Sequence, residues 1–178
     1  MTQDLATRLY ERCRLVGEFT LRSGQVSDQY FDKYLFEADP VLLREVAEAL
    51  VALLPGCDVL AGVEMGGIPI AAVMSQLTGL PAAYVRKEAK EYGTCKAVEG
   101  ADVSGRRVVL VEDTVTTAGA LVAACGQLRS LGASVQVALC AINRGTDGVP
   151  NLASVGVELR SPVDAEMLAT AARSLDSR

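Results

Sequence analysis

The 178-residue chain contains no histidine. Histidine is the commonest general base near neutral pH, and it completes the Ser/His and Cys/His nucleophilic arrangements. Carboxylates, lysines, arginines, hydroxyls or a metal must therefore carry any chemistry. The five cysteines are an odd number with no CxxC pair, so the sequence predicts free thiols and no zinc site.

Long hydrophobic runs are missing as well, although 50% of the residues are hydrophobic. No run approaches the roughly 20 apolar residues of a membrane helix, and no charged-then-apolar signal pattern opens the chain. A net charge of -5 argues against a broad nucleic-acid-binding face. We therefore expect one compact cytoplasmic domain over residues 1–178, whose partners are metabolites rather than nucleic acid or membrane.

The hydrophobic pattern predicts an α/β fold. Apolar residues spaced by three and four predict an opening helix from Gln3 to Val16, and the aromatic-rich stretch 18–35 predicts a small strand-turn-strand element. Apolar strands then alternate with helices, which is typical of a parallel sheet covered on both faces. The expected strands are 58–63, 82–85, 107–111 and 134–142, and the expected helices are 41–54, 68–77 and 118–131. Asp39-Pro40 marks the start of the first of these helices.

Polar residues follow four of these strands. In parallel sheets, ligands bind beyond the carboxyl ends of the strands. Those ends are followed here by 64–67, Arg86-Lys87, Glu112-Asp113 and Asn143-Arg144. The sequence therefore predicts that the chemistry gathers at one edge of the sheet.

The most informative segment is 108–120, in which an apolar strand leads to Glu112-Asp113 and then to hydroxyl and small residues entering a helix. Backbone amides and a helix N-terminus favour a phosphate. Two adjacent carboxylates need hydrogen-bond donors or positive charge, which ribose hydroxyls and a magnesium-bound sugar phosphate supply. The simpler alternative is a solvated acidic turn before an ordinary helix. Neither GxxxxGK[ST] nor GxGxxG occurs between a strand and a helix, so P-loop and dinucleotide folds are disfavoured.

A second segment, 84–93, places three cations after a strand, and polar sequence follows as far as Gly105. A loop of this length at the ligand edge favours a functional lid, and a solvated charged loop is the alternative. A third segment, Glu64–Pro69, has paired glycines at a strand-to-helix turn. Such glycines permit close approach of an anion to the backbone, whereas a simple tight turn would need no ligand.

Together these segments resemble the type I phosphoribosyltransferases. Residues 108–120 resemble the family's signature for phosphoribosyl pyrophosphate (PRPP), and Arg-Lys-Glu-Ala-Lys at 86–90 resembles the stretch characteristic of orotate phosphoribosyltransferases. The resemblance runs from Phe19 to Arg144. It implies a type I phosphoribosyltransferase fold, with a central parallel sheet flanked by helices, a core at about 40–145 and a mobile lid at about 87–104. It also implies a small hood, formed by residues 17–36 and the C-terminal segment.

The resemblance also implies site residues. Lys90 would stabilise the charge that builds on pyrophosphate, while Glu112 and Asp113 would hold the ribose hydroxyls. Arg144 and Thr116 would bind orotate, and Arg22 would contact orotate or PRPP. The implied PRPP-binding set is Arg22, Gly66, Gly67, Arg86, Lys87, Lys90, Tyr92, Glu112, Asp113, Thr114, Val115, Thr116, Thr117, Ala118, Gly119 and Ala120.

Four positions depart from the family pattern. Arg22 stands where lysine is common, and Asn143 stands where aspartate is frequent. Gly66 replaces a lysine that some members carry, which moves charge neutralisation to the lid and magnesium. Tyr92 stands where many members have histidine, and a phenol can donate a hydrogen bond but carries no positive charge.

The implied activity is transfer of phosphoribose from PRPP to orotate in pyrimidine biosynthesis. Mg²⁺ would be held mainly through PRPP, without protein metal ligands. The chain would act as a homodimer that shares lid residues across its interface, with the helix beginning at Ile68 as one contact. Three alternatives are a phosphoribosyltransferase for another base, a PRPP-sensing regulator of the same fold, and a structural scaffold.

Overall fold

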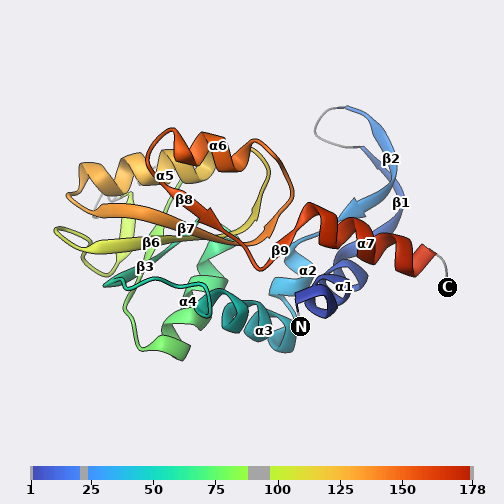
Figure 1. The fold of residues 1–178 in the computed structure, drawn as a ribbon, viewed down its shortest axis with the longest axis horizontal. Helices are drawn as coiled ribbons and strands as arrows, with labels where there is room; N and C mark the ends of the chain where they lie inside the picture. Colours follow the sequence, from blue (N-terminus) through green and yellow to red (C-terminus); the bar gives the residue numbers. More distant parts are fainter. Residues whose placement is uncertain (1, 21–23, 88–96, 177–178) are drawn as a thin grey trace.

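A seven-stranded sheet forms the centre of the computed structural model, which describes residues 2–20, 24–87 and 97–176 (Figure 1). The strand order is β5-β4-β3-β6-β7-β8, and β9 pairs with β7. Every adjacent pair is parallel except β4 and β5, which are antiparallel. The elements are α1 (Thr2–Cys13), β1 (Arg14–Thr20), β2 (Val26–Phe31), α2 (Tyr34–Glu37), α3 (Pro40–Val51), β3 (Val59–Val63), α4 (Gly67–Thr78), β4 (Ala82–Val85), β5 (Val98–Gly100), β6 (Arg107–Val115), α5 (Gly119–Ser130), β7 (Ser134–Asn143), α6 (Gly148–Ala153), β8 (Glu158–Arg160), β9 (Val163–Asp164) and α7 (Ala165–Asp176).

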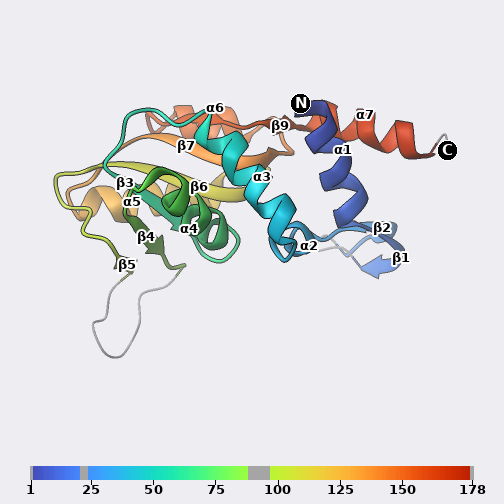
Figure 2. The ribbon, with the colours of Figure 1, turned by 90° about the horizontal axis from the view of Figure 1, so that it is seen from below.

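The sheet is buried on both faces. All five residues of β3 are buried, as expected for a strand between two layers of helices. Along β6, Val109 and Val111 join the core beneath α1–α4, whereas Val108 and Leu110 join the core beneath α5 and α6, because successive side chains point to opposite faces. Figure 2 shows α3 and α4 in front of the sheet and α5 and α6 behind it.

The antiparallel hairpin of β1 and β2 stands apart from the main sheet (Figure 1). It lies beside α1 and α7, so the first and last helices of the described chain pack together at this end. The rings of Phe19 and Tyr30 stack across the hairpin with centroids 5.6 Å apart. Among the described residues, no helix is both long and apolar enough to cross a membrane.

The structure confirms most of the expected elements. It places β4 at 82–85 as predicted, and β3 and β7 within a residue of their predicted bounds. Helix α3 begins after Asp39, whose carboxylate accepts hydrogen bonds from the amides of Val41 and Leu42. The side chain therefore caps the helix as the sequence predicts, although the helix ends at Val51 rather than Leu54.

Three predictions about boundaries were wrong. Helix α1 ends at Cys13, not Val16, because Arg14 pairs with Phe31 in the hairpin and leaves Val16 74% exposed. Strand β6 continues past Val111 because its pairing with β7 extends to Val115. The polar stretch before Gly105 is not a continuous loop, since β5 pairs with β4. The sequence analysis also missed α2, α6, β8, β9 and α7.

Gly62 of β3 allows α4 to pack closely against the sheet. A Cβ atom at this position would lie 2.6 Å from the carbonyl oxygen of Gly67 and 2.9 Å from the Cβ of Ala71. We expect Gly62→Ala to lower the free energy of unfolding by about 1–3 kcal/mol through overpacking, as measured by urea denaturation.

Gly126→Ala is the matched control. Gly126 lies within α5 with open space where its Cβ would be, so alanine should raise the free energy of unfolding by roughly 0.5–1 kcal/mol. Equal effects of the two substitutions would contradict the close packing of α4 on β3.

Candidate active site

Two buried carboxylates mark the carboxyl edge of the sheet. Glu112 is 7% exposed and Asp113 is fully buried, and among the described residues these are the buried charged side chains. Both belong to β6, where Glu112 pairs with Cys140 of β7, so they lie within a strand and not beyond its end as the sequence predicted. A strand holds its side chains more rigidly than a loop, which favours a preorganised site.

Asp113 is bound on both of its carboxylate oxygens. The amide and hydroxyl groups of Thr114 donate to Oδ1, the hydroxyl at 3.1 Å. Lys33 Nζ lies 2.5 Å from Oδ2. Lys33 directly precedes α2 in the segment that links the hairpin to the core. The sequence analysis gave Lys33 no role, and no local motif indicates one, because its partner lies in a distant strand.

A third carboxyl group, that of Glu37, lies against Asp113. Burial, and secondly the charge of Asp113, raises the pKa of Glu37 and of Glu112 well above the usual value. Burial alone would lower the pKa of Lys33, but the hydrogen bond and charge of Asp113 outweigh it and raise that pKa. Three carboxyl groups thus share one ammonium, and the cluster has room for further hydrogen-bond donors.

The segment that the sequence predicts to bind phosphate follows directly. Ala118 adopts a left-handed backbone conformation (φ 61°) immediately before α5. Thr116 and Thr117 are exposed, and the Asn151 side chain donates to the carbonyl of Thr117 at 3.0 Å. Exposed amides and hydroxyls at a helix N-terminus suit a phosphate. A cavity of about 600 Å³ is lined here by Val63, Val85, Arg86, Lys87, Glu112, Thr114, Val115, Thr116, Thr117, Ala118, Gly119, Ala120, Leu121, Ala123, Ala124 and Gln127.

The turn between β3 and α4 also packs against Asp113. A Cβ atom at Gly66 would overlap Asp113 Oδ2, and one at Gly67 would overlap the carbonyl oxygen of Val111. Both glycines are therefore required by close packing. Glu64 accepts a hydrogen bond from the amide of Lys87 at 2.9 Å, which ties this turn to the segment after β4.

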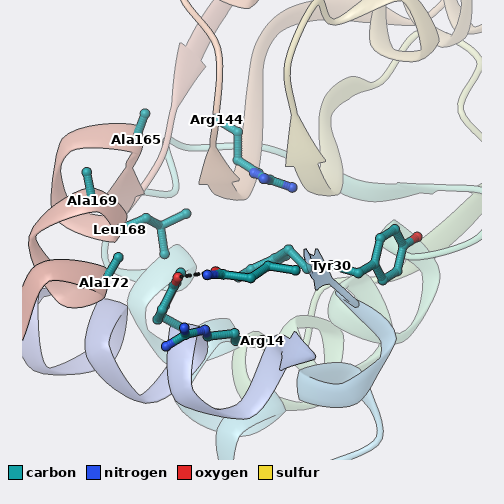
Figure 3. Close-up of a pocket in the computed structure, with 10 residues that line it drawn as sticks. Arg14, Tyr30, Arg144, Ala165, Leu168, Ala169 and Ala172 are labelled. Carbon is teal, nitrogen blue, oxygen red and sulfur yellow. Dashed lines mark hydrogen bonds between the residues drawn. The ribbon is translucent and has the colours of Figure 1, made fainter. Parts of the chain in front are cut away.

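Arg144, at the end of β7, lies on the hood side of the edge. Its guanidinium stands 4.8 Å from the centroid of the Phe31 ring. Figure 3 shows Arg144 and Arg14 on opposite sides of a cavity whose wall is formed by α7. The cavity has a volume of about 310 Å³ and is lined by Tyr10, Arg14, Gln29, Tyr30, Phe31, Arg144, Ala165, Leu168, Ala169 and Ala172.

The structure brings some of the predicted residues together and separates others. Arg86, Lys87, Glu112 and residues 114–120 share one cavity. Arg144 lines a different cavity, and Thr116 is not among the residues that line it. Gly145, the neighbour of Arg144, packs against the backbone of Thr116. Three predicted residues lie outside the described part of the chain: Arg22, Lys90 and Tyr92.

Sequence reasoning missed the aromatic floor of the Arg144 cavity. Tyr30 and Phe31 were assigned only to the strand-turn-strand element, yet they line this cavity with Arg144. The clustering of aromatic residues before Asp32 was the available signal, because exposed aromatic side chains in a short hairpin often contact a ligand.

The carboxyl cluster predicts how stability depends on pH. Because the pKa of Glu112 is higher in the folded than in the unfolded state, the folded protein binds more protons between about pH 4.5 and about 8. The free energy of unfolding should therefore fall as pH rises through this window, by at most about 1.4 kcal/mol per pH unit for this group. Glu112→Gln should make the free energy of unfolding depend less on pH, as measured by urea denaturation at pH 5, 6, 7 and 8.

Glu48→Gln is the control for this measurement. Glu48 forms an exposed ion pair with Arg44 on α3. The loss of this pair should leave the pH dependence of the free energy of unfolding unchanged. A parent protein whose stability rises from pH 5 to pH 8 would show that Glu112 is not kept protonated by its surroundings.

Comparison with known proteins agrees with this geometry. The family model for the phosphoribosyl transferase domain matches residues 38–161. Orotate phosphoribosyltransferase of Nocardioides sp. is 59% identical over 163 residues, which cover 90% of this chain and 91% of the relative. The orotate phosphoribosyltransferase of Methanocella arvoryzae is 43% identical over 153 residues, covering 85% and 87%.

Solved structures show the same architecture. The crystal structure of orotate phosphoribosyltransferase from Aeropyrum pernix matches with a TM-score of 0.82 at 34% identity, covering 98% of this chain and 99% of that one. The Mycobacterium tuberculosis enzyme in complex with Fe(III) dicitrate matches with a TM-score of 0.85 at 26% identity, covering 94% and 98%. The chain therefore has the type I phosphoribosyltransferase fold and belongs to the orotate phosphoribosyltransferase family.

Proposed function

We propose that this protein transfers the phosphoribosyl group of PRPP to orotate, which gives orotidine 5'-monophosphate and pyrophosphate for pyrimidine biosynthesis. The observation that carries the proposal is the rigid pair Glu112 and Asp113 at the end of β6. It lies between a phosphate-binding helix start and two cations, Arg86 and Lys87. PRPP has the matching order of groups: a 5'-phosphate, ribose hydroxyls and a pyrophosphate.

The charges of the site suit a displacement at the anomeric carbon of ribose. In an oxocarbenium-like transition state, positive charge develops on the sugar and negative charge on the departing pyrophosphate. Glu112 and Asp113 would accept hydrogen bonds from the ribose hydroxyls, and the carboxylate of Asp113 would stabilise the positive charge on the sugar. Arg86 and Lys87 would stabilise the pyrophosphate, and the N-terminus of α5 would hold the 5'-phosphate.

Arg144 supports orotate as the base. A guanidinium offers a planar pair of donors that matches a carboxylate, and orotate carries one. Phe31 beneath the guanidinium offers an apolar face for a flat pyrimidine ring. A base without a carboxylate would leave Arg144 without this pairing, so uracil and the purines fit less well.

The residues fit Mg²⁺ that is carried by the substrate. Among the described residues, no group of three or more Cys, Asp or Glu side chains could hold a metal ion. Asp113 Oδ1 accepts from Thr114 and Glu112 Oε1 accepts from the Asp113 amide, so these oxygens are already engaged. When bound, Mg²⁺ would neutralise the pyrophosphate, and Glu112 and Asp113 would still be used for the ribose.

The working unit is proposed to be a cytoplasmic homodimer. This proposal rests on the family resemblance, in which the lid reaches into the active site of the partner subunit. Lys90 and Tyr92 would be the lid residues that the partner receives. A non-enzymatic regulator is the second possibility, but the curated relatives named above are transferases and cover most of this chain.

Arg144→Ala tests the base assignment. With Mg²⁺ and PRPP at saturation, the loss of orotate absorbance should show KM for orotate raised about 10- to 100-fold, since a charge-assisted pair of hydrogen bonds is lost. KM for PRPP should change little. Arg44→Ala, at an exposed ion pair of α3, should match the parent. Turnover of uracil by the parent at the rate of orotate would reject the assignment.

Lys90→Ala tests the lid. The loss of a cation that acts on the departing pyrophosphate should lower kcat by roughly 100-fold or more, with orotate binding retained. Single-turnover rates with saturating PRPP would measure this. If subunits share their lids, then mixing inactive Lys90→Ala subunits with inactive Asp113→Asn subunits should restore part of the activity. Failure of mixed subunits to recover any activity would contradict a shared lid.

A further inference from the structure

A second cavity at the carboxyl edge is rich in positive charge. Its volume is about 490 Å³, and its lining residues are Lys33, Tyr34, Glu64, Met65, Arg86 and Lys87. Arg86 and Lys87 also line the cavity of the phosphate-binding segment, so the two cavities adjoin. Three cations and one carboxylate around one space make it suitable for an anion.

Lys33 reaches this cavity from outside the core. It belongs to the segment between the hairpin and α2, whereas Arg86 and Lys87 follow β4. Its Nζ lies 2.5 Å from Asp113 Oδ2 and 5.3 Å from the centroid of the Tyr34 ring. The side chain is one-third exposed, so a single ammonium faces both a buried carboxylate and an open cavity. A lysine on a flexible stem can move between two such partners.

Gly66 leaves the space beside Asp113 Oδ2 open to Lys33. A Cβ atom at Gly66 would overlap Asp113 Oδ2, the same oxygen that Lys33 contacts, and would lie 2.7 Å from Glu37 Oε1. Position 66 therefore cannot carry a side chain while Asp113 is in this position. Among the described residues, the positive charge that contacts Asp113 comes instead from Lys33.

We infer that Lys33 binds the pyrophosphate group of PRPP, and that it does so by exchanging partners. In the free protein its ammonium pairs with Asp113. When PRPP binds, a ribose hydroxyl donates to Asp113 in its place, and Nζ turns to the pyrophosphate in the cavity that it shares with Arg86 and Lys87. The inference rests on the proposed function and adds a residue to its binding site.

The exchange keeps every charged group paired. A fully buried carboxylate without a donor is strongly unfavourable, so Lys33 can leave Asp113 only when another donor replaces it. The ribose hydroxyls supply that donor, and the pyrophosphate supplies the new anion. Both arrive on one molecule. The competing explanation is that Lys33 serves only as a fixed counter-ion for Asp113.

Binding of PRPP, which carries both the ribose hydroxyls and the pyrophosphate, separates the two explanations. Calorimetry with Mg²⁺ and PRPP should show binding to Lys33→Met at least about tenfold weaker than to the parent, a difference expected when one charged partner is lost. Lys33→Arg, which keeps the charge, should recover most of the affinity. Arg44→Met removes a cation remote from the site and should bind as the parent does.

Lys33→Met alone could weaken the fold by leaving Asp113 unpaired, so the same comparison is made in an Asp113→Asn background. There the buried charge is absent, and thermal unfolding checks that both proteins are folded. PRPP should still bind about tenfold more weakly to the Lys33→Met, Asp113→Asn protein than to Asp113→Asn. Equal affinity of these two proteins would overturn the inference and leave Lys33 as a counter-ion.

These measurements need no orotate, so they are independent of the base. Parallel assays of the parent with PRPP and orotate test the proposed function separately. In those assays Lys33→Met should raise KM for PRPP about tenfold while KM for orotate stays within about twofold. A parent that binds PRPP through Lys33 but does not consume orotate would reject the base and keep the role of Lys33.

Discussion

The ion pair between Lys33 and Asp113 is the contact on which the arrangement of the site depends. Asp113 is fully buried at the end of β6, and desolvating a carboxylate costs several kcal/mol unless it is paired and hydrogen-bonded. Lys33 provides the charge, and Thr114 provides the hydrogen bonds. Because Lys33 follows the hairpin directly, this contact links the hairpin to the end of β6 in the free protein. Phe31, the last residue of β2, lies against Arg144 at the same edge of the sheet.

The same constraint explains the sequence around Asp113. Gly66 has no side chain because the space is taken by Asp113, and Gly67 has none because α4 approaches the backbone of β6. Glu112 and Glu37 are held close to Asp113, which raises the pKa of each. Local rules of stability are broken here by placing three carboxyl groups together, two of them buried. Such conflicts are expected where a protein binds a ligand rather than where it only folds.

The sequence predicted the parts of the fold that follow from local pattern. Continuous apolar runs located β3, β4 and β7, and a capping aspartate located the start of α3. The pattern was misleading where a tertiary contact took over: the spacing of Cys13 and Val16 fits a helix, but pairing with β2 turns that stretch into a strand. Polar residues usually end a strand, yet pairing with β7 continues β6 through Glu112 and Asp113.

The residues of the site divide in the same way, into those that local sequence indicates and those that only tertiary contacts bring together. Residues 112–120 could be predicted as site residues because they lie in one continuous segment, and Arg144 because it follows the predicted end of a strand. Lys33 and Phe31 were missed because each acts on a residue far away in the sequence, Lys33 on Asp113 and Phe31 on Arg144. The hydrophobic periodicity of a sequence does not indicate contacts between residues so far apart in the chain. Only the packing of the hairpin against the carboxyl edge brings them together.

Under the proposed function, the balance of charge in the site would favour PRPP over simpler ligands. An anion alone would satisfy Arg86 and Lys87, but it would draw Lys33 away from Asp113 and leave Oδ2 of that carboxylate without a donor. A sugar alone would satisfy the carboxylates and leave the cations unpaired. A molecule that presents hydroxyl donors and a pyrophosphate at the right spacing satisfies both sets at once. Under the proposed function, the cost of grouping these carboxyl groups in the free protein would be reduced when PRPP binds.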